Sequence, residues 1–171
     1  MSEIQRLREI VAQLRAPGGC PWDREQTHES LIRCLIEEVS ETLEAIDNQD
    51  YVLMEEELGD LLLQVVFHSL LAEEQSKFNL EDVARGINQK LIRRHPHVFG
   101  DVDDNMKSAE EVLERWEAIK EKEKRMRGIV ESKESNFKKL PPRLPALLFA
   151  YDVYKRAHRN GLEKELSLIH I

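Results

Sequence analysis

Cysteine is scarce in this chain: its 171 residues include only Cys20 and Cys34. The two lack the close spacing of cysteine zinc sites, and they are too few for the disulfide framework of a small secreted domain. We interpret both as buried or free thiols and expect a reducing, cytoplasmic location.

Long apolar runs are also missing. No stretch approaches the roughly 20 apolar residues that a helix needs to cross a bilayer. The first eleven residues, MSEIQRLREIV, lack the apolar core of a secretory signal. We therefore predict a soluble protein without a membrane partner. Its length suits one domain, or one domain with a partial extension.

Basic residues are outnumbered: 25 Lys and Arg face 33 Asp and Glu, for a formal net charge of −8. This balance argues against non-specific nucleic-acid binding, which requires a basic surface. It does not exclude a nucleotide, because a few local cations and a metal ion can neutralise a small phosphorylated ligand.

Apolar residues recur with helical spacing almost throughout, and no alternating strand pattern is present. The sequence predicts an all-α antiparallel helical bundle. We expect a loop or short turn at 20–27, and non-helical chain at 95–101 because the residue before Pro96 disfavours the α region. Helices are predicted over about 4–14, 29–47, 51–76, 79–94, 108–127 and 144–160.

Two groups of carboxylates stand out, Glu37-Glu38-x-x-Glu41 and Glu57-x-x-Asp60. Carboxylates at this spacing share a helix face and repel one another. A solvated acidic face is one interpretation. The other is a site for a hard divalent cation, because Mg²⁺ takes oxygen ligands and often binds a substrate phosphate as well.

The helix predicted at 51–76 favours the metal site. On a helical wheel Glu57, Asp60, Gln64 and His68 form one narrow wedge, while leucines and valines cover much of the remaining circumference. A helix that is apolar over most of its surface is buried. Burying this one requires more surface than a small bundle offers, so we predict a dimer or higher oligomer with the polar wedge inside.

Basic side chains form a second group of candidate site residues, beside the carboxylates. Lys90, Arg93 and Arg94 lie in the last turn of the helix at 79–94. They could stabilise the helix C-terminus electrostatically or bind the phosphates of a triphosphate. Trp116 and Lys120 lie one turn apart on the next helix. Trp116 could lie in the core or stack on a base, and Lys120 could lie on the surface or contact a phosphate. The residue types alone do not decide between these alternatives.

Five segments together carry a family resemblance: GGCPWDREQTHESL, LIEEVSETLEAI, EELGDLLLQVVFH, KLIRRHPHVFGDV and EVLERWEAIKEKEK. In this order they closely resemble the MazG family of nucleoside triphosphate pyrophosphohydrolases, over roughly residues 1–125. The resemblance implies an all-α fold that dimerises into a four-helix core. It also implies hydrolysis of ribo- or deoxynucleoside triphosphates to the monophosphate and pyrophosphate with Mg²⁺, or with Mn²⁺ in its place.

The resemblance and the residue types together indicate the roles of individual residues. We expect a carboxylate, Glu38 or Glu37, to orient or deprotonate the attacking water. Magnesium ligands would be Glu38, Glu41, Glu57 and Asp60. Nucleotide and phosphate contacts would come from Lys90, Arg93, Arg94, Trp116 and Lys120.

The C-terminal part departs from the family pattern. We expect a MazG-like domain at 1–127, a polar linker at 128–142, and at 143–171 a helix resembling the start of a second repeat with an unmatched tail. Our hypothesis is that the chain is a truncated version of a longer protein, or an open reading frame that runs into foreign sequence. An alternative function follows, a catalytically weak or inactive oligomeric scaffold or regulatory module that binds nucleotide and metal without turnover.

Overall fold

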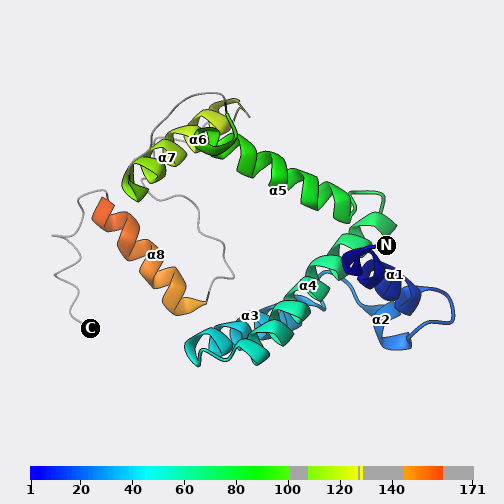
Figure 1. The fold of residues 1–171 in the computed structure, drawn as a ribbon. Coiled ribbons are helices and arrows are strands. Elements are labelled where there is room, and N and C mark those ends of the chain that lie inside the picture. The colour runs from blue at the N-terminus through cyan, green and yellow to red at the C-terminus, as the bar shows by residue number, and fades with distance from the viewer. Residues whose placement is uncertain (101–107, 127, 129–144, 160–171) are drawn as a thin grey trace. The chain divides into compact units, whose positions relative to one another are not determined.

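The computed structural model describes residues 1–100, 108–126, 128 and 145–159, and these form helices and turns without any strand. The chain divides into two compact units, 1–105 and 106–171. The all-α fold is thus confirmed for the described residues (Figure 1). The first unit contains α1 (Glu3–Arg15), α2 (Pro21–Glu25), α3 (Ile32–Asp47), α4 (Tyr51–Glu74), α5 (Leu80–Arg94) and α6 (Pro96–Phe99). The second contains α7 (Ala109–Met126) and α8 (Ala146–Arg159).

Local side-chain contacts explain where the helices begin and end. The side chain of Asn79 accepts a hydrogen bond from the Asp82 amide, and the side chain of Asp82 accepts one from the Asn79 amide, so that α5 begins with a capping box. The side chain of Asp50 accepts hydrogen bonds from the Val52 and Leu53 amides and so caps α4. Gln49 has a positive φ of 55°, which ends α3 and reverses the chain into α4.

The expectation that 95–101 is non-helical is wrong for Pro96–Phe99, which forms α6. The steric restriction before proline acts on His95 alone, whose φ of −123° and ψ of 57° lie outside the helical region. Pro96 itself has a φ suited to the first position of a helix. The segment at 20–27 likewise contains the short helix α2.

α3 begins three residues later than predicted. Thr27 and Ser30 form reciprocal hydrogen bonds, with the Thr27 amide donating to Ser30 Oγ (2.9 Å) and the Ser30 amide to Thr27 Oγ1 (3.2 Å). Such side-chain bonds to the backbone favour a turn over a helix.

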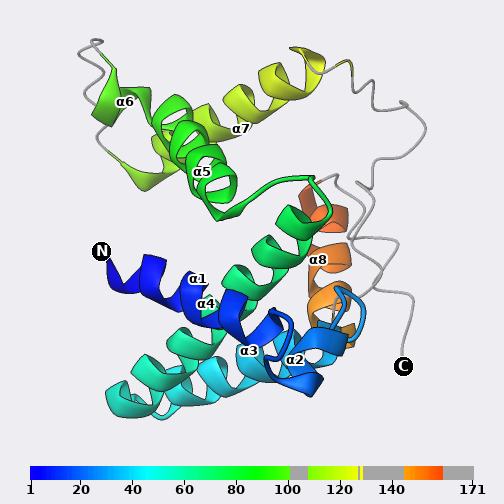
Figure 2. The same cartoon turned by 90° about the vertical axis from the view of Figure 1, so that its right-hand side faces the viewer.

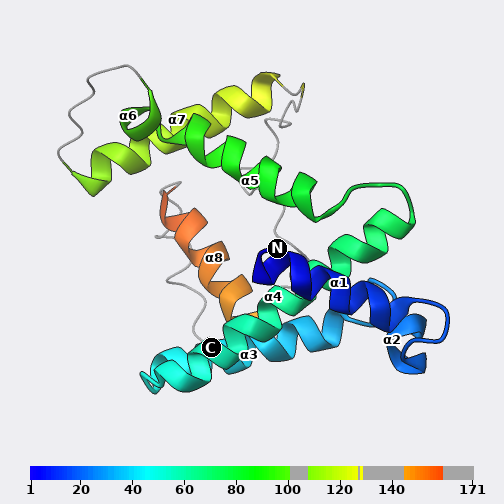
Figure 3. The ribbon, with the colours of Figure 1, turned by 45° about the vertical axis from the view of Figure 1, so that its right-hand side comes forward.

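α4 is the centre of the first unit, since α1, α3 and α5 all contact it. α3 and α4 run antiparallel and side by side, whereas α5 leaves the end of α4 and diverges, so that α4 and α5 form a V (Figures 1 and 3). The core lies between α1 and the C-terminal half of α4. Its buried members are Val11, Leu31, Val66, Phe67, Leu70 and Leu71.

Not all of the apolar surface of α4 is buried in the single chain. Leu58, Leu62 and Val65 remain 37–50% exposed on one side of it. α3 adds four exposed apolar side chains, Ile36, Val39, Leu43 and Ile46. The wheel's polar wedge is interior as predicted, with Glu57 and Gln64 buried and Asp60 and His68 half-buried.

In the second unit, the Ser108 side chain accepts a hydrogen bond from the Glu111 amide and so begins α7. α8 occupies most of the helix predicted at 144–160. Most of the predicted linker and the C-terminal tail lie outside the described residues. Within the described residues, none of the helices has the length and apolar composition of a membrane span.

Candidate metal and nucleotide site

Three of the predicted carboxylates meet between α3 and α4. Glu38, Glu41 and Glu57 each offer an oxygen within 4.8 Å of the others. Their positions follow from the antiparallel pairing, because Glu38 and Glu41 share a face of α3 and Glu57 projects toward it from α4. Asp60 lies one turn beyond Glu57, half-buried, and its charge acts on both Glu38 and Glu57.

The electrostatics of this cluster are unfavourable without a cation. Burial raises the pKa of Glu57, and the charges of Glu41, Asp60 and Glu38 raise it further. The pKa of Glu38 is raised by burial, then by Asp60 and Glu41. Glu57 is only 8% exposed, and its buried Oε2 has no hydrogen-bond partner.

The residues present fit a hard divalent cation. An unpaired buried carboxylate is costly, and a metal ion compensates that cost. The donor set consists of carboxylate oxygens from two packed helices, which suits Mg²⁺ or Mn²⁺ better than a thiolate-binding metal.

Glu37 belongs to the acidic motif but lies apart from the three clustered oxygens. It is exposed, and its Oε1 accepts a hydrogen bond from Arg33 Nε at 2.7 Å. Its charge still contributes to the raised pKa of Glu38. The structure therefore separates the two candidate catalytic carboxylates, with Glu38 inside the cluster and Glu37 at its edge.

The predicted phosphate-binding residues of α5 are not brought to this cluster within the chain. Lys90 and Arg93 are exposed and Arg94 is half-buried, all in the last turns of α5. In three views that end of α5 lies away from α3 and the first half of α4 (Figures 1, 2 and 3).

Trp116 and Lys120 meet on α7 of the second unit. The Lys120 ammonium lies 4.5 Å from the centre of the Trp116 ring and 2.7 Å from Glu117 Oε1. Both side chains are half-buried. The two predicted residues therefore lie in direct cation–π contact within this unit.

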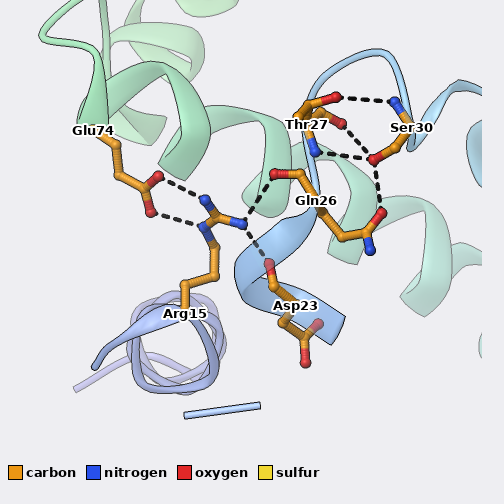
Figure 4. A network of polar contacts seen from close by, with 6 residues as sticks. All are labelled: Arg15, Asp23, Gln26, Thr27, Ser30 and Glu74. Carbon is orange, nitrogen blue, oxygen red and sulfur yellow. Dashed lines mark hydrogen bonds and ion pairs between the residues drawn. The ribbon is translucent and has the colours of Figure 1, made fainter. Parts of the chain in front are cut away.

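A polar network that the sequence did not reveal fixes the segment leading into α3 (Figure 4). Arg15, at the end of α1, donates to both carboxylate oxygens of Glu74 at 2.7 Å. It also donates to the backbone carbonyls of Asp23 and Gln26. Its side chain is 9% exposed, and its guanidinium lies over the ring of Phe67. One buried cation thus ties α1, α4 and the α2–α3 connection together.

A histidine pair adds a second tie between that connection and α4. His28 Nδ1 and His68 Nδ1 are 2.8 Å apart in rings whose planes differ by 1°. A short contact between two imidazole nitrogens requires that one donates and the other accepts. The pKa of His68 is lowered by burial and then by the charge of His28.

These two ties lie at one end of the α3–α4 pair and the carboxylate cluster lies further along it. Neither could be found from spacing, since Arg15 and Glu74 are 59 positions apart and the other acceptors of Arg15 are backbone carbonyls. The one local signal was the presence of His68 in the polar wedge of α4.

Several known proteins and one protein family are similar to this chain. The MazG nucleotide pyrophosphohydrolase domain matches residues 26–99, which contain the whole carboxylate cluster. The chain is 46% identical over 160 residues to a nucleoside triphosphate pyrophosphohydrolase/pyrophosphatase MazG of Thermotoga maritima, covering 94% of this chain and 58% of that protein. It is 41% identical over 164 residues to a nucleoside triphosphate pyrophosphohydrolase of Escherichia coli K12, covering 95% of this chain and 60% of that protein.

A solved structure is similar as well. The crystal structure of a mazG-related protein from Thermotoga maritima superposes with a TM-score of 0.57 at 30% identity, covering 68% of this chain and 98% of that one. The chain spans only 58–60% of the length of the two curated relatives named above. Because of the matched domain, the sequence identities and the shared fold, we conclude that the chain belongs to the MazG family.

Proposed function

We propose that this chain hydrolyses nucleoside triphosphates, ribo- or deoxy-, to the nucleoside monophosphate and pyrophosphate with a divalent metal. The observation that carries the proposal is the buried Glu57 carboxylate, whose Oε2 lacks a partner inside a cluster of like charges. The relatives' names point to the same reaction.

The metal ligands would be Glu38, Glu41, Glu57 and Asp60, with Mg²⁺ as the expected ion and Mn²⁺ as its substitute. A bound divalent ion would neutralise charge on the triphosphate and lower the pKa of a coordinated water. The raised pKa values of Glu38 and Glu57 mean that protons compete with the metal as the pH falls.

Glu38 is the better candidate for the residue that accepts the proton of the attacking water. Its raised pKa makes it a stronger base than an ordinary carboxylate, whereas Glu37 is engaged by Arg33. Water would attack phosphorus on one side of the anhydride between the α- and β-phosphates, and that bond would break. The phosphate on the other side would leave with the electron pair, which gives the monophosphate and pyrophosphate.

The positive residues would bind the phosphates. Lys90 and Arg94, with Arg93 beside them, would contact the triphosphate, where arginine offers a planar pair of donors and lysine a point charge. Lys120 would add a further charge, and Trp116 would stack on the base.

The protein would act as a cytoplasmic homodimer or higher oligomer. The exposed apolar side chains of α3 and α4 support this, because large apolar patches on a single chain commonly mark an interface. The catalytic domain would span 1–127, followed by a linker at 128–142 and a partial second repeat at 143–171.

The test is to incubate the purified chain with each ribo- and deoxynucleoside triphosphate and Mg²⁺, and to measure monophosphate and pyrophosphate. Glu57→Gln and Asp60→Asn should abolish pyrophosphate release while the far-UV circular dichroism stays unchanged. Glu55→Gln, an exposed carboxylate two positions from Glu57, is the matched control and should retain activity. Full activity in both cluster variants would remove the carboxylates from the mechanism.

The same experiment addresses the alternative of a nucleotide- and metal-binding scaffold without turnover. A scaffold would bind the metal–nucleotide complex in calorimetry and release no pyrophosphate with any of the triphosphates.

A further inference from the structure

We infer that Gln64 is a specificity-determining residue, whose side-chain carbonyl accepts a hydrogen bond from the nucleoside part of the bound substrate. The donor is a sugar hydroxyl or an exocyclic amino group of the base. This inference rests on the proposed function, because it places the nucleoside beside the carboxylate cluster that would hold the metal and the phosphates.

Gln64 carries an unpaired acceptor in the interior of the protein. The residue is only 6% exposed, and among the described residues its Oε1 atom has no hydrogen-bond partner. A buried carbonyl oxygen without a partner costs free energy, and native structures retain few of them. Glu57 Oε2 is in the same state, but it is charged and suits a metal ion. The neutral carbonyl of Gln64 requires a hydrogen-bond donor instead.

The position of Gln64 connects it with the candidate site. It lies one turn beyond Asp60 and about 10 Å beyond Glu57 along the axis of α4, on the same face of that helix. The pair of His28 and His68 lies one turn further along the same face. Gln64 therefore lies between the carboxylate cluster and the end of the polar face that the α2–α3 connection covers.

The order of groups in a nucleotide matches this order along α4. A triphosphate at the metal is followed by the sugar and then by the base, both of which extend away from the cluster. The polar face of α4 offers them a path, since leucines and valines cover much of the rest of the helix. Sugar and base carry uncharged hydroxyl and amino donors, and these suit a neutral amide carbonyl.

A buried acceptor distinguishes substrates that differ by one donor. An analogue that lacks the donor leaves the Gln64 carbonyl unpaired in the complex, and the site then rejects that analogue. We expect the wild type to prefer the substrate with the donor by about 10-fold or more in kcat/KM.

Deleting single donors from the substrate identifies the group that Gln64 reads. ATP, GTP and CTP are each compared with the analogue that lacks only the amino group of the base, and with the 2′-deoxy and 3′-deoxy forms. The enzymes are the wild type, Gln64→Met and Gln64→Leu. Methionine keeps the length of glutamine and lacks the carbonyl, and leucine is a second apolar replacement. The preference of the wild type should shrink to near unity in both variants.

Thermal unfolding of the free protein gives a measurement that does not depend on turnover. Because Gln64 Oε1 has no partner within the described part of the chain, an apolar side chain of similar size should raise the Tm. Gln75→Met is the matched control, since Gln75 is exposed just after the end of α4. It should leave both the substrate preference and the Tm close to the wild-type values.

Three results would overturn the inference. They are a wild type that does not prefer any substrate over its analogue, a preference that both Gln64 variants keep, and a lower Tm in both variants. A wild type that releases no pyrophosphate from any triphosphate would instead overturn the proposed function. Calorimetry of the same substrate pairs with Mg²⁺ then decides the inference. The wild type should bind the parent nucleotide more tightly and both variants should bind the two alike, whereas equal or absent binding by the wild type would refute it.

Discussion

Replacing Arg15 by methionine is expected to destabilise the fold more than its single salt bridge would suggest. Methionine keeps much of the apolar stem and removes the guanidinium. The lost contacts are the bidentate pair with Glu74 and the bonds to the carbonyls of Asp23 and Gln26. The carbonyls would be left without this donor at a part-buried position.

The size of the effect follows from these contacts. Because the Glu74 side chain is 43% exposed, solvent screens the ion pair and we assign it about 1 kcal/mol. The two carbonyl bonds add roughly 0.5–1.5 kcal/mol each. The expected total is about 3 kcal/mol, which for a chain of this length lowers Tm by roughly 6–12 °C.

Thermal and urea unfolding of Arg15→Met, Glu74→Gln and the double variant form the assay. Glu74→Gln should cost about 1 kcal/mol, and the double variant no more than Arg15→Met alone. The hydrogen bond from Arg15 also lowers the pKa of Glu74. The pair therefore stabilises the folded state above the ordinary carboxyl pKa, and this stabilisation is lost as the pH falls through the lowered pKa of Glu74.

Arg33→Met is the control, because Arg33 forms an equally short pair with Glu37 but is 87% exposed. It should change stability by less than about 0.5 kcal/mol. Equal losses in Arg15→Met and Arg33→Met would refute the reasoning, since burial and the carbonyl bonds would then contribute nothing.

Other substitutions test separate features. Gly19→Ala should lower the free energy of unfolding by roughly 2 kcal/mol or more, because its Cβ would lie 2.2 Å from the Leu14 carbonyl oxygen. Gly86→Ala, whose Cβ would meet nothing within 4 Å, should raise the free energy of unfolding by up to about 1 kcal/mol. Equal Tm values for the two variants would contradict this. Because the pKa of His68 is lowered, its pair with His28 stabilises the fold above the ordinary histidine pKa, and this stabilisation is lost as the pH falls below it. The Tm of the wild type should therefore fall more between pH 7.5 and 5.5 than the Tm of His68→Gln. Mg²⁺ at about 100 times its Kd should raise the free energy of unfolding of the wild type by about 2.7 kcal/mol. An equal Mg²⁺-dependent stabilisation of Glu57→Gln would argue against Glu57 as a ligand.

The parts of the fold that could be predicted from sequence are those set by local rules. Asn79 and Asp82 lie three positions apart, so their reciprocal cap is visible in the sequence. The interior position of Glu57 followed from the apolar residues around it on one helix. α6 was missed because the restriction on His95 was extended to the residues after Pro96, where proline favours the first turn of a helix.

Long-range pairs could not be predicted from one sequence. Nothing near Arg15 indicates Glu74, and nothing near His28 indicates His68 forty positions later. The carboxylates of the site were identified because two local motifs meet on neighbouring antiparallel helices. The separation of Lys90 and Arg94 from that cluster depends on the angle at which α5 leaves α4, which periodicity does not encode.

The central position of α4 has a consequence for the order of folding. α3 and α4 are consecutive and joined by a short turn, so their pairing closes only a small loop and should form early. α1 packs on α4 across a much longer stretch of chain, and the Arg15–Glu74 contact spans 59 positions. We expect pulse-labelled hydrogen exchange to protect the amides of α3 and α4 before those of α1. Protection of α1 at the same time as the hairpin would indicate a single concerted step.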